Sequence, residues 1–233
     1  MPVFLLSNDL EFPPPHLASP EGLLAVGGDL CLERLLLAYE KGIFPWYSEG
    51  EPILWWSPDP RLVLYPDELH VSRRLRRILR QKQFEITFDR DFVSVIQACA
   101  QTRIVNGEGT WIVDDIIQAY CQLHEAGFAH SVEAWQDGQL VGGLYGVSLG
   151  LAFFGESMFS TVANASSAAF VTLVRSLRQL SFRLIDCQIT TAHLMRFGAQ
   201  EIARLQYLKE LRRCLQAPTH KGNWAFPTDL HVC

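Results

Sequence analysis

Several signatures of common protein classes are missing from this sequence. The six cysteines of the 233-residue chain form no CxxC pair and have no His at a ligand-like spacing, so neither a zinc site nor another metal site is expected. The opening residues, MPVFLLSNDLEFPPP, lack the basic segment of a signal peptide. No apolar run approaches the ~20 residues of a membrane span. We therefore expect a cytoplasmic protein with reduced thiols and no membrane partner.

Motifs of covalent and nucleotide-dependent catalysis are also missing. The chain has no G-x-S-x-G turn, and no Cys or Ser has a neighbouring His at a telling spacing. The glycine pair at residues 142–143 lies on a predicted strand and matches neither G-x-G-x-x-G nor a P-loop. The residues therefore indicate neither a covalent nucleophile nor a cradle for nucleotide phosphates.

Charge is scarce, and its balance is acidic. Charged residues make up 19% of the chain and the net charge is -5, which argues against binding nucleic acid through bulk charge. Hydrophobic residues make up 48%, an ordinary value for one or two globular domains with a substantial core. A nucleic-acid partner would therefore need a local basic patch.

One such patch is predicted on a helix over residues 73–83, which Ser72 would cap and which has Leu75, Ile78 and Leu79 on its apolar face. A basic run is most often a solvated surface. Here the basic residues gather without an interleaved acid in an acidic chain, which favours contact with a phosphate backbone. The basic residues of this helix are Arg73, Arg74, Arg76, Arg77, Arg80 and Lys82.

Tryptophan and proline are concentrated in residues 42–60, GIFPWYSEGEPILWWSPDP. Prolines this dense prevent a regular helix, so the aromatic residues are expected on loops or short strands. A place in a small aromatic core is the favoured interpretation for Trp55 and Trp56. Trp46, in the FPW turn, is equally suited to an exposed platform on which a base stacks.

The second half of the chain predicts an α+β fold. Residues 131–136, 139–148 and 151–159 have the pattern of an antiparallel meander, with a hairpin turn at residues 137–138. A helix over residues 165–180 and a buried strand over residues 184–188 follow, and Thr191 is expected to cap a short helix. A composition shift near residues 83–89 predicts a small N-terminal domain over residues 1–83 and a catalytic domain over residues 84–233.

The remaining segments give weaker signals. Residues 1–28 are expected to be loop-rich because of their proline run and glycine pair. Asp114 is expected to cap a helix over residues 115–125. Further helices are predicted over residues 31–41 and 207–215 and from Asp91 onward, and further strands over residues 61–65, 84–88 and 199–203.

Two carboxylates interrupt otherwise apolar strands. Glu156 lies in the nearly uncharged stretch 140–160, and Asp186 lies in the short strand 184–188. A buried carboxylate costs several kcal/mol unless it is paired or protonated. Strand alternation predicts that Asp186 and Gln188 share one face, and that Phe154, Glu156 and Met158 share another. Each acid alone is equally suited to capping backbone groups, but the set favours a pocket in which an acyl or aminoacyl group meets an amine.

Six motifs resemble, in order and over essentially the whole chain, the leucyl/phenylalanyl-tRNA–protein transferase family. They are GIFPWYSEGEPILWWSPDPR (42–61), GTWI (109–112), AHSVEAW (129–135), LVGGLYGV (140–147), FFGESMFS (153–160) and LIDCQ (184–188). The resemblance implies a C-terminal domain of the GNAT acyltransferase fold after a small N-terminal domain. It implies transfer of Leu or Phe, and less readily Met, from aminoacyl-tRNA to a protein with N-terminal Arg or Lys, which marks that protein for N-degron degradation. No metal or dissociable cofactor would be needed.

The same resemblance implies the roles of residues in the reaction. Asp186 and Gln188 would hold and polarise the acceptor amine, and Glu156 would lie in the same cleft. The pocket for the aminoacyl side chain would be lined by Phe153, Met158 and Ile185. An apolar pocket separates substrates that differ by one methylene by only ~1–3 kcal/mol, so tolerance of Met is physically reasonable.

Contacts with tRNA are implied in the same way. Trp46 and Trp111 would contact the 3′ adenosine, and the basic helix from Arg73 would lie along the tRNA. The sequence departs from the family after FFGESMFS, where residues 160–170 contain neither Lys nor Arg in place of a charged loop and an ASK motif.

Two other functions fit part of the pattern. An acyl-CoA-dependent N-acetyltransferase of the same fold would need a Gly-rich turn for the pyrophosphate, and residues 159–165, FSTVANA, contain no glycine. A non-catalytic tRNA-binding module would explain the aromatic loops and the basic helix. It would leave Glu156, Asp186 and Gln188 without a role.

Overall fold

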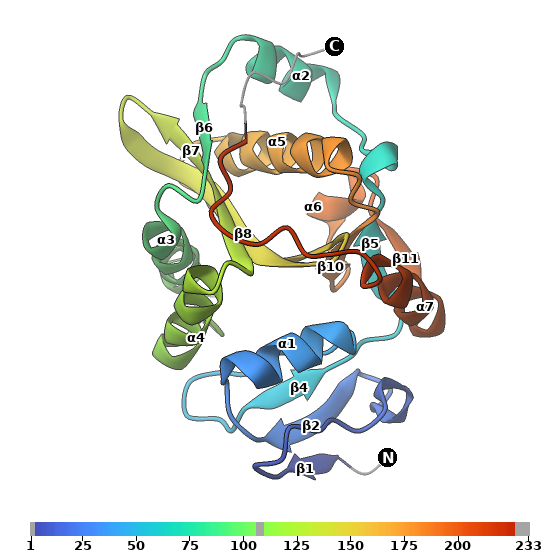
Figure 1. Cartoon of the computed structure of the whole chain (residues 1–233). Helices are drawn as coiled ribbons and strands as arrows, with labels where there is room; N and C mark the ends of the chain where they lie inside the picture. Colours follow the sequence, from blue (N-terminus) through green and yellow to red (C-terminus); the bar gives the residue numbers. More distant parts are fainter. Residues whose placement is uncertain (1–2, 106–109, 227–233) are drawn as a thin grey trace.

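The computed structural model describes residues 3–105 and 110–226 and has a mixed α+β architecture with two sheets (Figure 1). The small sheet has the strand order β1-β2-β4-β3 and lies beside helix α1 (Leu32–Glu40). The large sheet has the order β11-β5-β10-β9-β8-β7-β6. The α+β class expected from the strand and helix patterns is confirmed.

The small sheet begins in a segment that was expected to be loop-rich. Strands β1 (Phe4–Leu6) and β2 (Leu23–Gly27) pair in parallel, and β2 pairs with β4 (Leu54–Trp56), which also pairs with β3 (Phe44–Pro45). The expectation of loops over residues 1–28 was therefore wrong for these two strands. They are too short to give an alternating pattern, and their stability comes from partners distant in sequence.

Trp55 is at the centre of the small sheet, as the aromatic-core interpretation predicted. Its side chain is fully buried, its ring makes an edge contact with Phe12 at 4.8 Å between centroids, and its Nε1 donates to the Gly27 carbonyl at 2.8 Å. Trp56 is half-buried and its Nε1 donates to the Trp46 carbonyl at 2.7 Å, which fixes the FPW turn.

The large sheet contains the predicted meander. Strands β7 (Ala129–Gln136), β8 (Gln139–Leu149) and β9 (Ala152–Ser160) are antiparallel neighbours, and β6 (Glu85–Phe88) pairs with β7. Strand β10 (Leu184–Gln188) then runs parallel to β9. Strands β5 (Arg61–Leu64) and β11 (Gln200–Ile202) complete the sheet on the β10 side.

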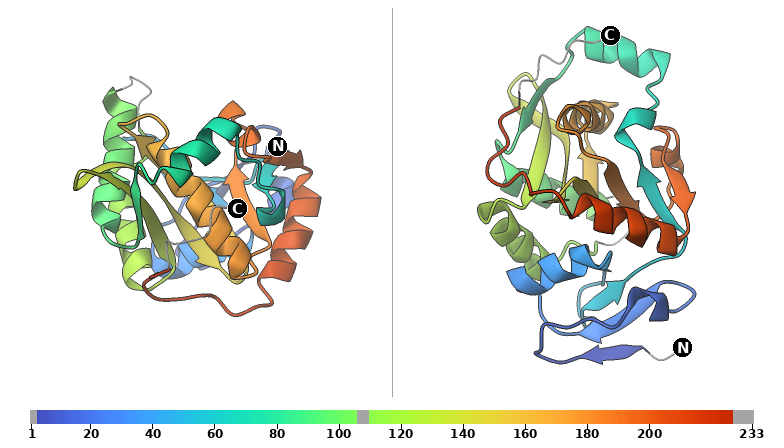
Figure 2. Two further views of the ribbon diagram at one scale, coloured as in Figure 1. Left: turned by 90° about the horizontal axis from the view of Figure 1, so that it is seen from above. Right: turned by 45° about the vertical axis from the view of Figure 1, so that its right-hand side comes forward.

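Helices cover both faces of the large sheet (Figures 1 and 2). Helix α5 (Ala165–Gln179) packs on one face, and α3 (Phe92–Val105), α4 (Asp114–Glu125) and α1 lie on the other. Helices α6 (Ala192–Met195) and α7 (Arg204–Cys214) flank the β10 end. Two hydrophobic clusters result, here called the α5-side core and the α1-side core.

Helix α2 (Arg73–Arg80) and strand β5 connect the two halves of the chain. The apolar residues Leu75 and Ile78 of α2 belong to the α5-side core, and β5 is a strand of the large sheet. By sheet membership, the change from one half to the other falls between β4 and β5. The division of the chain into residues 1–83 and 84–233 stays a prediction.

The helix starts test three capping predictions. Ser72 Oγ accepts from the Leu75 amide at 3.2 Å and Thr191 Oγ1 accepts from the Leu194 amide at 3.3 Å, so both caps are confirmed. Asp114 was expected to be a cap, but it occupies the first turn of α4 after Val113, where a carboxylate still interacts favourably with the helix dipole.

Two further features bear on function. Among residues 3–105 and 110–226, no helix combines the length and hydropathy needed to cross a bilayer. The same residues contain no cluster of three or more His, Cys, Asp or Glu side chains arranged to hold a metal ion.

Candidate active site

Strand β9 contains a bulge at Glu156. Gly146 of β8 pairs with Gly155 of β9, and Tyr145, the residue before Gly146, pairs with Ser157. Glu156 is therefore an extra residue of β9 without an opposite partner. A Cβ on Gly146 would lie 2.2 Å from the Phe154 carbonyl oxygen, so this close approach requires glycine.

The bulge overturns one prediction from strand alternation. Phe154 lies in the α1-side core, 5.0 Å from the Tyr39 ring, and Glu156 bonds to the same tyrosine. Met158 instead packs against the α5-side core. Because a bulge inserts one residue and reverses the alternation beyond it, Met158 does not share the face of Phe154 and Glu156.

Glu156 is buried at the centre of a hydrogen-bond network. Its Oε1 accepts from Tyr39 Oη at 2.7 Å and from Gln188 Nε2 at 2.8 Å, and its Oε2 accepts from Tyr120 Oη at 3.1 Å. The hydroxyls of Tyr39 and Tyr120 also lie within hydrogen-bond distance of each other, so these three contacts share two hydroxyl protons while Glu156 is ionised. Burial raises the pKa of Glu156 to about 7, against the lowering effect of the tyrosine hydrogen bonds. Glu156 therefore changes its charge near neutral pH.

Asp186 is fully buried in a bidentate ion pair with Arg61. Arg61 Nε donates to Oδ1 at 2.8 Å and Nη2 donates to Oδ2 at 2.6 Å. Tyr207 Oη donates to Oδ2 at 2.7 Å, and the Gln188 amide donates to Oδ1 at 2.9 Å. Four donors occupy the two oxygens, about as many as a carboxylate accepts.

The Arg61 guanidinium contacts the rings of Phe44 and Tyr207, at 4.8 Å and 4.6 Å from their centroids. Its burial acts to lower its pKa, but the charge of Asp186, the neighbouring Tyr207, the hydrogen bonds to Asp186 and the charge of Glu156 together outweigh burial and raise the pKa above the ordinary value for arginine. The guanidinium is therefore held in its charged form.

Gln188 links the two carboxylates. The pairing of β10 with β5 shifts between Asp186 and Gln188, and Gln188 has a φ of +61°. The bond from its amide to Asp186 holds this left-handed conformation, and its side chain donates to Glu156. The three candidate catalytic residues thus belong to one connected network, with Gln188 in the middle.

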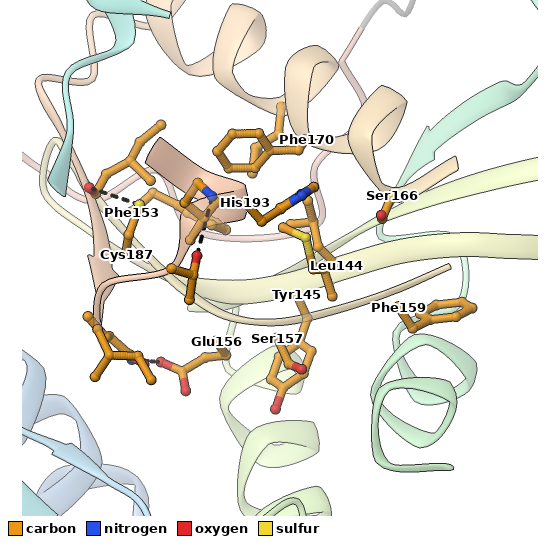
Figure 3. A pocket seen from close by; sticks show the side chains of 18 of the residues that line it. Leu144, Tyr145, Phe153, Glu156, Ser157, Phe159, Ser166, Phe170, Cys187 and His193 are labelled. Atoms are coloured by element: carbon orange, nitrogen blue, oxygen red, sulfur yellow. Dashed lines mark hydrogen bonds between the residues drawn. The ribbon is translucent and has the colours of Figure 1, made fainter. Parts of the chain in front are cut away.

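A cavity of about 730 Å³ lies next to this network (Figure 3). Glu156 and Gln188 line it, whereas Asp186 does not. The three residues predicted for the aminoacyl pocket, Phe153, Met158 and Ile185, all line it. Further lining residues that the sequence reasoning did not assign to the pocket include Leu144, Ser166, Phe170, Leu173, Cys187, His193 and Leu194.

Sequence signals existed for some of these residues and not for others. Phe170 and Leu173 belong to the helix predicted over residues 165–180, where apolar residues are usually part of the core. Tyr39 and Tyr120 come from the two helices α1 and α4, and nothing in their sequence surroundings sets them apart. Their contribution requires the tertiary fold.

Trp46 and Trp111 line the same cavity from loops. Trp46 is 38% exposed and packs against Trp56 with 5.7 Å between ring centroids. Trp111 is half-buried ahead of α4. The two predicted stacking residues are thus brought to one cavity from segments 65 residues apart in the sequence (111 minus 46).

The basic residues of α2 are not among those that line the cavity. Helix α2 lies beyond α5, on the side of the molecule away from the small sheet (Figures 1 and 2). Their side chains are exposed, whereas Leu75 and Ile78 face the core. The exposed residues are Arg73, Arg74, Arg76, Arg77 and Arg80.

Comparison with known proteins gives a consistent result. Residues 63–212 match the family model for leucyl/phenylalanyl-tRNA protein transferase, and residues 28–59 match the model for the N-terminal domain of that family. A leucyl/phenylalanyl-tRNA–protein transferase from Desulfatibacillum aliphaticivorans is 58% identical over 98% of this chain and 98% of its own length. One from Syntrophobacter fumaroxidans is 56% identical over 96% of both chains.

Among solved structures, L-PGS from Bacillus licheniformis aligns with a TM-score of 0.41 and 11% identity over 72% of this chain and 54% of that chain. This likeness is too weak to bear on function. The family models and the full-length relatives are decisive, because they cover both halves of the chain and the whole candidate site. The chain therefore belongs to the leucyl/phenylalanyl-tRNA–protein transferase family.

Proposed function

We propose that this enzyme transfers Leu or Phe, and less readily Met, from aminoacyl-tRNA to proteins with N-terminal Arg or Lys, which marks them for N-degron degradation. The observation that carries this proposal is the contact between Glu156 and Gln188 at the edge of an apolar cavity that Trp46 and Trp111 also line. Family membership supports the same reaction.

The reaction is the aminolysis of an ester. The α-amine nitrogen of the acceptor attacks the carbonyl carbon of the aminoacyl ester, a C–N bond forms, and the C–O bond to the ribose of the terminal adenosine breaks. The amine loses a proton and the ribose oxygen gains one. Because the ester is already activated, the enzyme mainly supplies proximity, orientation and a place for the proton.

Glu156 is the residue we propose for that proton. A carboxyl group with a pKa of about 7 accepts a proton from the amine and returns it near neutral pH, which suits general acid–base catalysis. The Nε2 of Gln188 orients Glu156. The side-chain carbonyl of Gln188 remains able to accept a hydrogen bond from the α-amine of the acceptor protein.

We propose that Asp186 acts through Gln188 as a positioning residue. Its oxygens are occupied by Arg61, Tyr207 and the Gln188 amide, and it does not line the cavity. The sequence predicted direct contact between Asp186 and the amine. The occupied oxygens of Asp186 and its position outside the cavity lining do not favour that contact.

The apolar lining suits a Leu, Phe or Met side chain, with Phe153, Met158 and Ile185 as the proposed contacts. Trp46 and Trp111 are proposed to stack on the 3′ adenosine, since base–aromatic stacking contributes ~1–3 kcal/mol per base. The exposed arginines of α2 are proposed to contact the tRNA backbone.

We further propose that the C-terminal part has the GNAT acyltransferase fold and that a small N-terminal domain precedes it, for which the sequence predicted residues 1–83. An antiparallel meander followed by a helix and a strand parallel to the last meander strand supports the fold proposal. The presence of β5 in the large sheet favours an earlier boundary, near residue 60.

The test measures transfer of radiolabelled leucine from leucyl-tRNA to a protein with N-terminal Arg. Label is expected on this protein and not on a version with N-terminal Ala. Glu156→Gln is expected to lose most transfer but still bind aminoacyl-tRNA. Glu133→Gln is the matched control, because Glu133 is a fully buried carboxyl group outside the cavity. Acetylation from acetyl-CoA without transfer from tRNA, or tight tRNA binding without any transfer by the wild type, would contradict the proposal.

A further inference from the structure

Two tyrosines from different helices meet at the buried carboxyl group of Glu156. Tyr39 belongs to α1 and Tyr120 belongs to α4, and these two helices lie side by side (Figure 1). Tyr39 Oη donates to Glu156 Oε1 at 2.7 Å, and Tyr120 Oη donates to Oε2 at 3.1 Å. Each oxygen of the carboxyl group therefore has a tyrosine donor of its own.

The tyrosines lie behind Glu156 as seen from the cavity. Glu156 lines the cavity, whereas Tyr39 and Tyr120 are not among its lining residues. Their side chains are fully buried, at 1% and 0% exposed. A substrate in the cavity therefore meets the carboxyl group and not the two hydroxyls, so an effect of the tyrosines on the reaction has to pass through Glu156.

Both tyrosines remain hydrogen-bond donors while Glu156 titrates. Burial, and then the charge of Glu156, raise the pKa of Tyr39 and of Tyr120 well above the ordinary value for tyrosine. Each hydroxyl has one proton, and an ionised carboxylate is a stronger acceptor than the neighbouring hydroxyl oxygen. When Glu156 is ionised, both tyrosine protons are therefore directed at the carboxylate.

The charges around Glu156 act in opposite directions on its proton affinity. The titratable and charged side chains that act on it are Tyr39 of α1, Tyr120 of α4, Asp186 of β10 and Arg61 of β5. Burial, and then the charge of Asp186, raise the pKa of Glu156, and the tyrosine hydrogen bonds lower it. Because Arg61 is paired with Asp186, the tyrosines are the donors that directly stabilise the ionised carboxylate from the α1 side.

We propose that Tyr39 and Tyr120 are positioning residues of the reaction, which hold Glu156 at the edge of the cavity with a donor on each oxygen of its ionised form. This inference rests on the proposed function. It also gives the N-terminal part of the chain a share in catalysis. Tyr39 lies in residues 28–59, which match the N-terminal domain model, whereas Tyr120 and Glu156 lie in residues 63–212.

The first test is the pH profile of kcat/KM with leucyl-tRNA in Tyr39→Phe and Tyr120→Phe. Hydrogen bonds to a charged group are stronger than neutral ones, so loss of a donor costs the ionised carboxylate more than the protonated group. We expect the rise of kcat/KM to move up by about one pH unit in each variant. The loss relative to the wild type is then about tenfold at pH 6 and less than about twofold at pH 9.

The matched control is Tyr65→Phe. Tyr65 Oη also donates to a carboxylate, Glu210 Oε2 at 2.8 Å, but neither residue lines the cavity. This variant removes the same kind of hydrogen bond outside the site, and it is expected to keep the wild-type pH profile. A shift as large as in Tyr39→Phe would contradict a specific role of the two tyrosines.

A double-variant experiment shows whether Tyr39 acts through Glu156. In Glu156→Gln the titrating carboxylate is absent, so adding Tyr39→Phe is expected to lower kcat/KM at pH 6 by less than about twofold. The same substitution in the wild-type background is expected to lower it about tenfold. A merely structural role of Tyr39 predicts equal losses in both backgrounds, and equal losses would overturn the inference.

The titration of Glu156 is also measurable without the reaction. Protein labelled with ¹³Cδ-glutamate gives a carboxyl signal for Glu156, assigned by its loss in Glu156→Gln. We expect this signal to titrate at higher pH in Tyr39→Phe and Tyr120→Phe. In wild-type protein that contains 3-fluorotyrosine, whose more acidic hydroxyls are stronger donors, it is expected to titrate at lower pH.

An unchanged or opposite shift of the carboxyl titration would overturn the inference. If one phenylalanine variant does not fold, the other variant and the fluorotyrosine protein decide. Absence of transfer from any aminoacyl-tRNA by the wild type would instead overturn the proposed function. The carboxyl titration does not depend on transfer, so it distinguishes the two failures.

Discussion

Glu156 is buried and accepts hydrogen bonds from three side chains, and its buried position makes the stability of the protein depend on pH. Its folded pKa of about 7 is above the ordinary value of 4.5, so the folded state binds a proton more tightly than the unfolded state does. The stabilisation from the protonated form is complete below pH ~4.5 and is lost as the pH rises through ~7. We expect the free energy of unfolding of the wild type to fall between pH 5 and pH 8 by more than that of Glu156→Gln, measured by urea denaturation. Parallel pH dependences would contradict this assignment.

The same residue predicts the pH dependence of catalysis. With Glu156 as proton acceptor, kcat/KM is expected to rise as the pH increases through about 7. Glu156→Gln is expected to lower kcat by about 10²-fold or more, as removal of a general base does. Its profile retains only the titration of the acceptor α-amine, at about pH 7.7–8.0. Steady-state rates from pH 5.5 to 9 check this, and a rise near pH 7 that persists in the variant would identify another base.

At the level of elements, the end of β10 depends on the buried pair of Arg61 and Asp186. Removing one partner of such a pair leaves an uncompensated charge, so Arg61→Met is expected to cost about 3–5 kcal/mol of stability. The double variant Arg61→Met/Asp186→Leu is expected to regain most of that stability, because apolar replacement of a buried pair is often neutral. It is not expected to regain activity, because Gln188 has lost the partner that fixes its backbone. Denaturation and kcat measurements on the single and double variants separate the two effects, and an active double variant would remove the positioning role of Asp186.

Helix α2 predicts a salt-dependent contribution to tRNA binding. Replacing Arg73, Arg74 and Arg77 by Gln is expected to weaken binding and to lower the salt slope by about 2–3, at ~0.7–0.9 for each lost phosphate contact. Stability is expected to change little, because these side chains are exposed. Filter binding of tRNA at two salt concentrations measures the affinity and its salt slope. The control is Arg212→Gln/Arg213→Gln on α7, where two exposed arginines lie at another basic helix end. An equal loss of tRNA affinity in this control would show that α2 has no specific role in tRNA binding.

Strands β9 and β10 show which features of the site were predictable from the sequence and which were not. Acidic residues in apolar strands were a sufficient signal for Glu156 and Asp186, since burial of an unpaired carboxylate is costly. The bulges of β9 and β10 were not predictable, because an inserted residue leaves a plausible alternating pattern on both sides. The partner of Asp186 was hidden as well, since Arg61 opens a strand 125 residues earlier in the chain.

At the scale of the whole molecule, the chain around Trp224, near the end of the described residues, is part of the fold. The Trp224 ring stacks on His130 of β7 with 3.7 Å between centroids, and its amide donates to Asp89 at 2.7 Å. Trp224→Ala is expected to cost about 3–5 kcal/mol, as truncation of a buried aromatic residue does. Because Trp224 does not line the cavity, kcat/KM for Leu-tRNA at 20 °C is expected to stay within about twofold of the wild type as long as the variant is folded. Thermal melting and transfer assays check the two statements, and a large loss of activity in a folded variant would connect this segment to the site.

The position of β5 between β10 and β11 has a consequence for synthesis of the protein on the ribosome. Arg61 emerges 125 residues before Asp186. At 5–20 residues per second, translation needs roughly 6–25 s to supply the partner of this cation. During that time β5 has neither of its neighbouring strands, and the nascent chain exposes an apolar strand with unpaired edges. The large sheet is therefore completed late in synthesis. The nascent enzyme is a candidate client of chaperones that shield such strands until β10 and β11 are made.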